Sequence, residues 1–197
     1  MPCTTLAGLM KMFMQEILPA NVTKAIFVDT DAFFISDPVH LWNVFSTLRP
    51  ETAFVIPFHP DVVDHWNGAG RICSCIMLLD MQKLRDKRFM GSSLYKKINP
   101  EDTEEALADA AFLAKYGPPS TEGKNKGKHE NVMLGDQGLW WAVVDSYKEM
   151  VEPLSYDFEV TSCNVESYGT GLGDDNVSEE DELKRQTHTK DTPQEVS

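Results

Sequence analysis

The residues of this sequence best suited to chemistry are two aspartates, Asp29 and Asp31, at the end of an apolar run that begins at Lys24. The apolar run predicts a buried strand. Because side chains alternate along a strand, residues two positions apart project to the same side, and both carboxylates are expected to face one point. Two such carboxylates are costly unless a cation lies between them. The spacing predicts a Mg²⁺ or Mn²⁺ site, since these ions often bind one or two carboxylates together with substrate phosphates.

The same spacing has a simpler interpretation, in which Asp29 and Asp31 only cap a turn at the end of the strand. Taken by itself, the Asp-x-Asp tripeptide favours that simpler interpretation. A later loop contributes His59 and His65 near further aspartates. A ligand role for either histidine is the less favoured interpretation, because polar side chains collect in surface loops for many reasons.

An amphipathic helix is expected ahead of the strand. Its apolar residues recur at helical spacing and form one stripe, which consists of Leu6, Leu9, Met10, Phe13, Met14 and Ile17. Thr4 or Thr5 can cap the start, and Pro19 lies just past the end. We expect this helix to pack its stripe against the sheet.

Strands and helices alternate through the rest of the chain. Strands are predicted at 52–57, 72–79 and within 156–168, and helices from Asp37-Pro38, from Asp80 to about Phe89, from Thr103 to Tyr116, and from Gly135-Asp136 onward. Beyond residue 173 the chain is acidic with almost no apolar residues. We therefore expect one folded domain at 1–173 and a disordered acidic tail at 174–197.

The composition is that of a globular domain with a core. The chain has 197 residues, of which 42% are hydrophobic and 25% charged. A formal net charge of −13 argues against nucleic acid or an anionic membrane as partner. There is no secretory signal and no run of membrane-spanning length, so the chain as given is expected to be soluble.

The four cysteines predict free thiols rather than a cross-link. Cys73 and Cys75 point the same way along one predicted strand, which is poor geometry for a local disulfide, and their spacing is not a zinc signature. With Cys3 and Cys163 they are interpreted as small apolar side chains.

Three segments, in this order, resemble family 8 glycosyltransferases, in particular the branch of LARGE-type xylosyltransferases and their fungal relatives. The first is 10–42, which includes Asp29-Thr30-Asp31. The second is 73–85, similar to the family's Asn-Ala/Ser-Gly-Val-Met-Leu strand. The third is 135–140, which looks like the family's Asp-Gln segment.

The resemblance implies an α/β GT-A fold, a mixed sheet flanked by helices, and transfer of a sugar from a nucleotide-diphosphate donor with retention of configuration. It implies that Asp29 and Asp31, with Thr30 between them, hold Mn²⁺ or Mg²⁺ against the diphosphate of a UDP-sugar. It places Asp136 and Gln137 beside the donor sugar. The acceptor would be a glycan or glycoprotein, and the location the secretory pathway or Golgi lumen; with a genuine start at Met1 and no signal or anchor, the chain would be soluble and cytoplasmic.

The sequence departs from the family in three places. Cys73 and Cys75 stand where the family usually has Asn and Gly, and a late His-x-x-Gly-x-x-Lys-Pro-Trp segment has no counterpart. The chain also begins within the helix that precedes the metal-binding strand, whereas family members carry an earlier βαβ portion that binds uridine and ribose. We therefore expect an N-terminally incomplete fold with weak or absent transferase activity for this chain alone.

Two other classes of function stay open from the sequence. One is a degenerate, non-catalytic domain that binds glycan or a partner through the former donor cleft. The other is a metal-dependent phosphohydrolase that uses Asp29 and Asp31, although the later lysine and acidic motif of that class are not found.

Overall fold

A mixed four-stranded sheet forms the centre of the fold in the computed structural model, which describes residues 6–30, 32, 34, 36–58, 68–155 and 158. The strands are β1 (Lys24–Val28), β2 (Phe54–Pro57), β3 (Ile76–Asp80) and β4 (Val151–Leu154). Their order is β1-β3-β2-β4; β3 is antiparallel to β1 and β2, and β4 is parallel to β2. The predicted α/β class, a mixed sheet flanked by helices, is confirmed.

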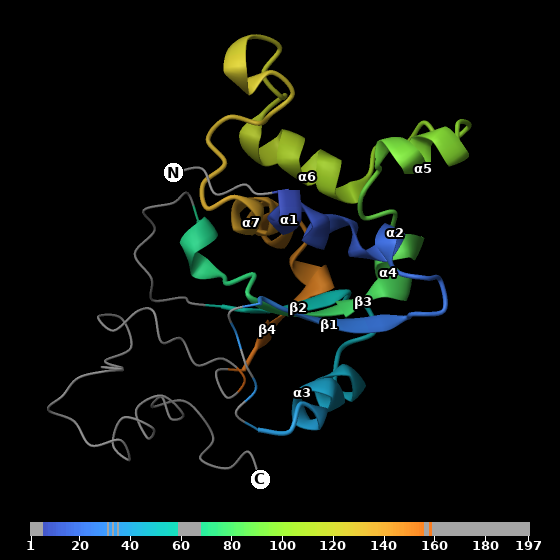
Figure 1. Ribbon diagram of the computed structural model, residues 1–197, viewed down its shortest axis with the longest axis vertical. Helices are drawn as coiled ribbons and strands as arrows, with labels where there is room; N and C mark the ends of the chain where they lie inside the picture. The colour runs from blue at the N-terminus through green and yellow to red at the C-terminus, as the bar shows by residue number, and fades with distance from the viewer. Residues whose placement is uncertain are drawn as a thin grey trace, which may run out of the picture.

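Helices cover both faces of the sheet (Figure 1). One face carries α3 (Val39–Asn43), while the helices gathered on the other side include α1, α2, α4, α6 and α7. Their bounds, with that of α5, are α1 Leu6–Met10, α2 Met14–Ile17, α4 Met81–Asp86, α5 Ser93–Ile98, α6 Leu107–Tyr116 and α7 Asp136–Ser146. Short 3-10 turns are η1 Lys11–Phe13, η2 Val44–Ser46, η3 Ala69–Arg71, η4 Gly123–Asn125 and η5 Lys148–Met150.

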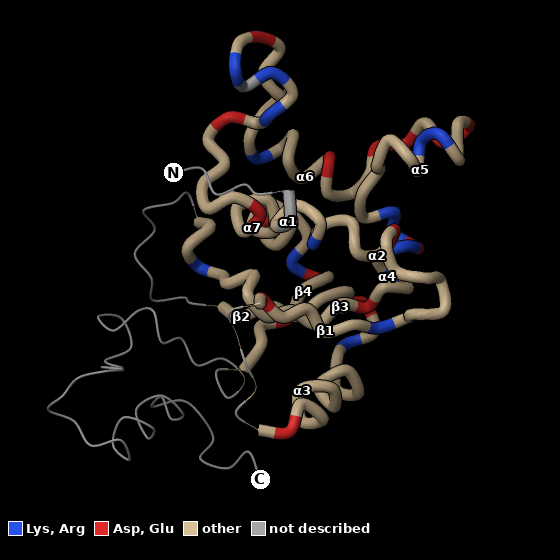
Figure 2. The backbone as a smooth tube through the Cα atoms, in the orientation of Figure 1, with Lys and Arg blue, Asp and Glu red and all other residues tan. Residues whose placement is uncertain are grey.

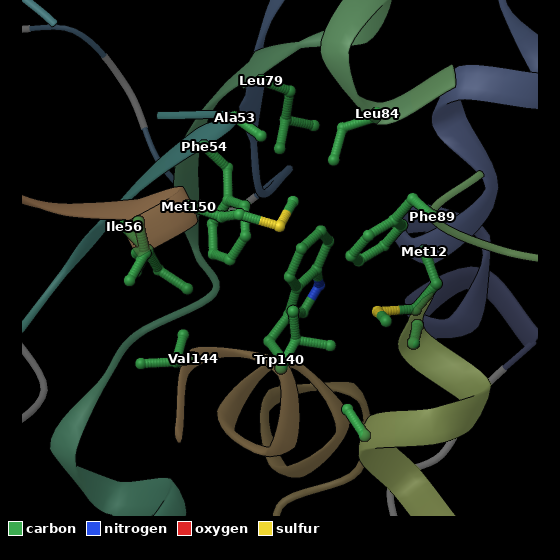
Figure 3. Packing of buried hydrophobic residues seen from close by; sticks show 14 of the residues in the cluster. Met12, Ala53, Phe54, Ile56, Leu79, Leu84, Phe89, Trp140, Val144 and Met150 are labelled. Carbon is green, nitrogen blue, oxygen red and sulfur yellow. The ribbon is translucent and has the colours of Figure 1, made fainter. Parts of the chain in front are cut away.

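The larger hydrophobic core lies between the sheet and α7, around Trp140 (Figure 3). The Trp140 ring centroid is 5.2 Å from that of Phe54 on β2 and 5.2 Å from that of Phe89, and all three side chains are fully buried. A smaller cluster on the opposite face joins α3 to the sheet through Leu41 and Val55. Neighbouring Phe54 and Val55 thus serve opposite faces, as alternation along a strand requires.

Most predicted local signals are found. Helical structure runs from Leu6 to Ile17, with the 3-10 turn η1 in its middle. Asp37 accepts a hydrogen bond from Val39 N at 2.9 Å at the start of α3, and Asp80 accepts one from Lys83 N at 3.0 Å at the start of α4. Gly117, whose φ of 73° favours glycine, ends α6 as expected.

The predicted apolar stripe of the first helical segment is not the face that it buries: Met10 and Ile17 are 49% and 50% exposed, whereas Met12 and Gln15 are buried. The 3-10 turn η1, with three residues per turn, breaks the helical period on which the stripe was inferred.

Other predictions also differ from the structure. The strand β1 is partly exposed rather than buried, because it lies at the edge of the described sheet. The helix expected from Thr103 begins at Leu107. Cys73 and Cys75 form a disulfide, with their Cα atoms 5.4 Å apart, because β3 begins only at Ile76 and the two cysteines therefore lie outside the strand on which free thiols were inferred. The elements α5 and β4 were not predicted.

Several sequence predictions fall outside the described residues. These are the roles of Asp31, His59 and His65, the cap at Thr4 or Thr5, the thiols of Cys3 and Cys163, almost all of the expected strand at 156–168, and the tail at 174–197.

Charged positions lie mainly on the outer helices and loops (Figure 2). The loop that follows α6 and the end of α5 carry several of them, whereas the central strands are mostly uncharged. Within the described residues, no helix has the length and apolar character needed to cross a bilayer.

Candidate functional site

The ammonium group of Lys11 lies at the centre of the candidate site. Although it is a lysine, the residue is only 7% exposed. Its Nζ atom lies 3.0 Å from Asp29 Oδ1, 3.1 Å from Asp136 Oδ2 and 3.0 Å from the carbonyl oxygen of Ser74. An ammonium has three N–H donors, so each of them has an acceptor. The group also lies 4.7 Å from the centre of the Phe27 ring, a favourable position for a cation.

Asp29 directly follows the edge strand β1. Its backbone N–H donates to the carbonyl of Cys75 at 2.8 Å, which extends the β1–β3 pairing by one hydrogen bond. This bond fixes the backbone position from which the Asp29 side chain projects. The strand then ends, and the Asp29 carbonyl accepts a hydrogen bond from Ala32 N at 3.1 Å. The argument from strand alternation therefore does not apply beyond Val28, and Asp31 lies outside the described residues.

Asp136 begins α7, where a carboxylate is stabilised by the helix dipole. Besides Lys11, its Oδ2 atom accepts a hydrogen bond from the Ser74 hydroxyl at 3.0 Å. Gly8 on α1 packs closely against the Asp136 side chain, because a Cβ added at Gly8 would lie only 2.7 Å from Asp136 Oδ1. The missing side chain at Gly8 thus lets the first helical segment approach the start of α7.

Tyr116, the last residue of α6, is hydrogen-bonded to the first turn of α7. Its hydroxyl donates to the carbonyl of Gly138 at 2.7 Å. Burial raises the pKa of Tyr116 to about 12, and the nearby Asp145 carboxylate adds to the effect. The hydroxyl therefore keeps its proton, and this contact, through the neutral range.

The Cys73–Cys75 disulfide encloses Ser74, which contacts both Lys11 and Asp136. A ring closed over three residues restricts the backbone of the middle one. Ser74 is 4% exposed, and its carbonyl and hydroxyl point into the cluster. Cys73 and Cys75 therefore hold the backbone of the serine between them.

Gln137 is placed differently from Asp136. Its side-chain Nε2 donates to the carbonyl of Ala69 at 2.7 Å and ties the start of α7 to η3. The structure thus brings together two of the sequence-predicted residues, Asp29 and Asp136, through Lys11, whereas the Gln137 side chain is bonded to η3.

Two members of the site, Lys11 and Ser74, were missed by sequence reasoning. Lys11 is the one basic residue of the segment 6–17, within an otherwise largely apolar helix, and that isolation was the available signal. Ser74 gave no signal beyond its place between two cysteines.

The cluster carries one excess negative charge, from two carboxylates against one ammonium. Within the described residues, no three His, Cys, Asp or Glu side chains come close enough together to hold a metal ion. The Asp29 side chain is nevertheless 34% exposed at the end of its strand. Asp29 is the more exposed of the two carboxylates, but its Oδ1 atom is already paired with the Lys11 ammonium at 3.0 Å. Mg²⁺ or Mn²⁺ commonly takes one or two carboxylates and completes its shell with water and phosphate oxygens, so Asp29 is the carboxylate of this cluster that such an ion could reach.

The fold is glycosyltransferase-like. Among solved structures, the chain is similar to mouse xyloside xylosyltransferase 1 in its apo form, with a TM-score of 0.55 and 16% sequence identity over 94% of this chain and 60% of that chain. The chain therefore corresponds to less than two thirds of the length of that protein. No protein-family model matches the sequence, and no curated protein matches it. At this identity the likeness concerns the fold.

Proposed function

We propose that this chain is a glycosyltransferase domain of family 8 type that binds a UDP-sugar at the Lys11 cluster and transfers the sugar, with retention of configuration, to a glycan or glycoprotein. The observation that carries the proposal is the convergence of Lys11, Asp29, Ser74 and Asp136 at one end of the sheet. The likeness of the fold to a xylosyltransferase supports the same reaction class.

The proposed roles combine the sequence resemblance with the contacts of the described residues. Asp29, with Asp31, would hold Mn²⁺ or Mg²⁺. When bound, such a metal neutralises the charge that develops on the diphosphate leaving group. Asp136 would orient the donor sugar. Lys11 is a positioning residue, because its ammonium fixes the carboxylates of Asp29 and Asp136 relative to each other.

Gln137 would support the site through its bond to η3. This bond ties the first turn of α7 to the carbonyl of Ala69. When a donor sugar binds, the Gln137 amide could break its hydrogen bond to the Ala69 carbonyl and donate to a sugar hydroxyl instead.

The test is Mn²⁺-dependent binding and cleavage of UDP-xylose and UDP-glucose. Calorimetry measures binding with Mn²⁺ and with EDTA, and a coupled assay measures UDP release. For this chain alone we expect binding weaker than micromolar, dependent on Mn²⁺, and lost in Asp29→Asn. Asp86→Asn, an exposed carboxylate on α4, is the matched control and should bind as the parent does.

A second candidate is a non-catalytic domain that binds glycan or a partner. It is favoured by the engagement of Asp136 and Gln137 with protein groups. A folded chain that binds no UDP-sugar at millimolar concentration, with or without Mn²⁺, would overturn the transferase proposal in favour of this one. Phosphate release from a generic phosphoester, without UDP release, would instead indicate a phosphohydrolase.

A further inference from the structure

The Cys73–Cys75 disulfide adjoins the candidate site but has no part in the proposed reaction. Both cysteines are partly exposed, whereas Ser74 between them is only 4% exposed. Thiol–disulfide exchange requires that a thiolate reach one of the two sulfur atoms, and partial exposure gives it that access. The disulfide can therefore react from the solvent, while the residue that it encloses faces the Lys11 cluster.

The backbone on either side of Ser74 is held by hydrogen bonds that do not involve sulfur. The Cys73 N–H donates to the carbonyl of Pro57 at 3.1 Å, and the Cys75 carbonyl accepts a hydrogen bond from the Asp29 N–H at 2.8 Å. Both bonds remain available when the sulfur–sulfur bond is broken. Opening of the ring thus acts on a short stretch, Ser74 and its two peptide groups, between two anchored ends.

Ser74 connects this ring to the charges of the cluster. Its carbonyl oxygen lies 3.0 Å from Lys11 Nζ, and its hydroxyl donates to Asp136 Oδ2 at 3.0 Å. The two contacts leave from one residue, so a single conformation of Ser74 must satisfy both. Without the ring the residue regains backbone freedom, and ordering it for both contacts then costs conformational entropy.

The two sulfur atoms of the disulfide differ in their surroundings. The backbone N–H of Cys75 donates to Cys73 Sγ at 3.3 Å. A hydrogen bond to the charged form stabilises a thiolate, and the better stabilised thiolate leaves faster in exchange. This contact therefore directs an incoming thiolate to Cys75 Sγ, with Cys73 as the leaving thiolate.

We propose that Cys73 and Cys75 form a redox switch that controls the order of the Lys11 cluster. A dithiol reductant attacks Cys75 Sγ as a thiolate, the sulfur–sulfur bond breaks, and its electron pair passes to Cys73 Sγ. The second thiolate of the reductant then displaces Cys75, so that the reductant leaves as a disulfide and its two protons end on the two cysteines. Ser74 is then no longer fixed against Lys11 and Asp136. The loosening of the cluster does not depend on the proposed function, whereas its effect on donor binding rests on it.

The experiment uses the full chain carrying Cys3→Ser and Cys163→Ser, in which Cys73 and Cys75 are the remaining cysteines, and dithiothreitol as the dithiol. Mass spectrometry after maleimide labelling should find no free thiol before reduction and two after it. The ¹H–¹⁵N NMR signal of the Lys11 ammonium, assigned by its loss in Lys11→Met, reports on the cluster. We expect this signal in the oxidised chain and its broadening or loss after reduction, with the backbone amide signals away from 73–75 unchanged.

The donor site is measured on the same two samples. Calorimetry with UDP-xylose and Mn²⁺ should give an affinity about tenfold lower after reduction, a difference of about 1.4 kcal/mol. Cys73→Ala/Cys75→Ala, which cannot close the ring, should resemble the reduced chain and should not respond to dithiothreitol.

Three results would overturn the switch: a Lys11 signal unchanged after both thiols are labelled, free thiols in the oxidised chain, or unfolding of the whole chain on reduction. A Lys11 signal that follows the redox state, without binding of UDP-xylose in either state, would overturn the proposed function alone.

Discussion

The ammonium of Lys11 and the carboxylates of Asp29 and Asp136 are held together in a largely buried position. Transfer of such charges out of water is expensive, and their attraction offsets that cost only when the remaining hydrogen-bonding capacity is also satisfied. The Ser74 carbonyl supplies the third acceptor of Lys11, and the Ser74 hydroxyl gives Asp136 a second donor. At the scale of single residues, the site is therefore one unit whose members depend on one another.

Replacement of Lys11 by Met should test this dependence. The substitution keeps the length of the side chain but leaves Asp29 and Asp136 facing each other without a cation. Because Asp29 is one-third exposed, we expect the lower end of the usual loss for a broken buried pair, about 3 kcal/mol in the free energy of unfolding by urea.

Lys87→Met is the matched control, since Lys87 is exposed at the end of α4, and it should change stability by less than about 0.5 kcal/mol. Equal stability of the two variants would contradict the central role of Lys11. The same pair of variants distinguishes positioning from bulk charge in the UDP-sugar binding assay.

At the scale of elements, helix starts place the side chains that matter. The start of α7 presents Asp136, and the start of α4 follows directly from strand β3 through Asp80. Only α4 follows a strand directly; α7 begins after a turn at Gly135. Two predictions belong to this level.

Asp80→Ala should destabilise the protein by about 1 kcal/mol, because it removes the N-cap that accepts a hydrogen bond from Lys83 N at 3.0 Å. Thermal or urea unfolding measures the loss. Asp80→Ser keeps a capping oxygen and should recover most of it; a serine variant as unstable as the alanine variant would show that the Asp80–Lys83 ion pair, not the cap, is responsible.

Gly138→Ala should disturb the first turn of α7. A Cβ there would lie 2.2 Å from the carbonyl oxygen of Met133, a backbone atom that cannot move aside cheaply. We expect a loss of about 1 to 3 kcal/mol together with weaker donor binding, because Asp136 shares that turn. Ser146→Ala, at the exposed end of the same helix, serves as control and should leave both quantities unchanged within about 0.5 kcal/mol.

At the scale of the whole molecule, contacts between distant segments join the edge strand β4 to the rest of the sheet. Arg49 and Thr52, which precede β2, both bind the Glu152 carboxylate on β4, and the Arg49 guanidinium also donates to the carbonyl of Val151 at 2.8 Å. These contacts support the parallel pairing of β2 with β4, whose residues are far apart in the chain.

The contacts of the Glu152 carboxylate predict that the stability of the protein depends on pH. Burial by itself would raise the pKa of Glu152, but hydrogen bonds from the Thr52 hydroxyl and the Arg49 N–H, together with the Arg49 charge, lower it overall. A carboxyl group whose pKa is lower in the folded state stabilises the fold above its unfolded pKa. The ordinary pKa of a glutamate, which applies to the unfolded chain, is about 4.3. The stabilisation is therefore present above that pH and is lost as the pH falls through the lower pKa of the folded state.

Urea midpoints measured from neutral pH down to acid should therefore fall less steeply in Glu152→Gln than in the parent. Glu149→Gln, an exposed neighbour, should follow the parent curve. Parallel curves for Glu152→Gln and the parent would contradict the assigned cause.

The sequence by itself determined the local elements of this protein. The helical segment at 6–17, the caps at Asp37 and Asp80 and the stop at Gly117 all act over a few residues, and the structure has each of them. Which face of that segment is buried did not follow from the pattern, since Met10 and Ile17 are half exposed. The strand before Asp29 and the helix that begins at Asp136 were likewise legible, because periodicity and capping are local properties of the chain.

Only the tertiary structure decided how these pieces make a site. The contacts of Ser74 with Lys11 and Asp136 join residues 63 and 62 positions apart, and no local pattern encodes such a pairing. The same holds for the exposed edge position of β1 and for the disulfide that encloses Ser74. A lysine in an apolar helix looks misplaced in the sequence; burial beside two carboxylates from distant segments supplies the reason for its presence.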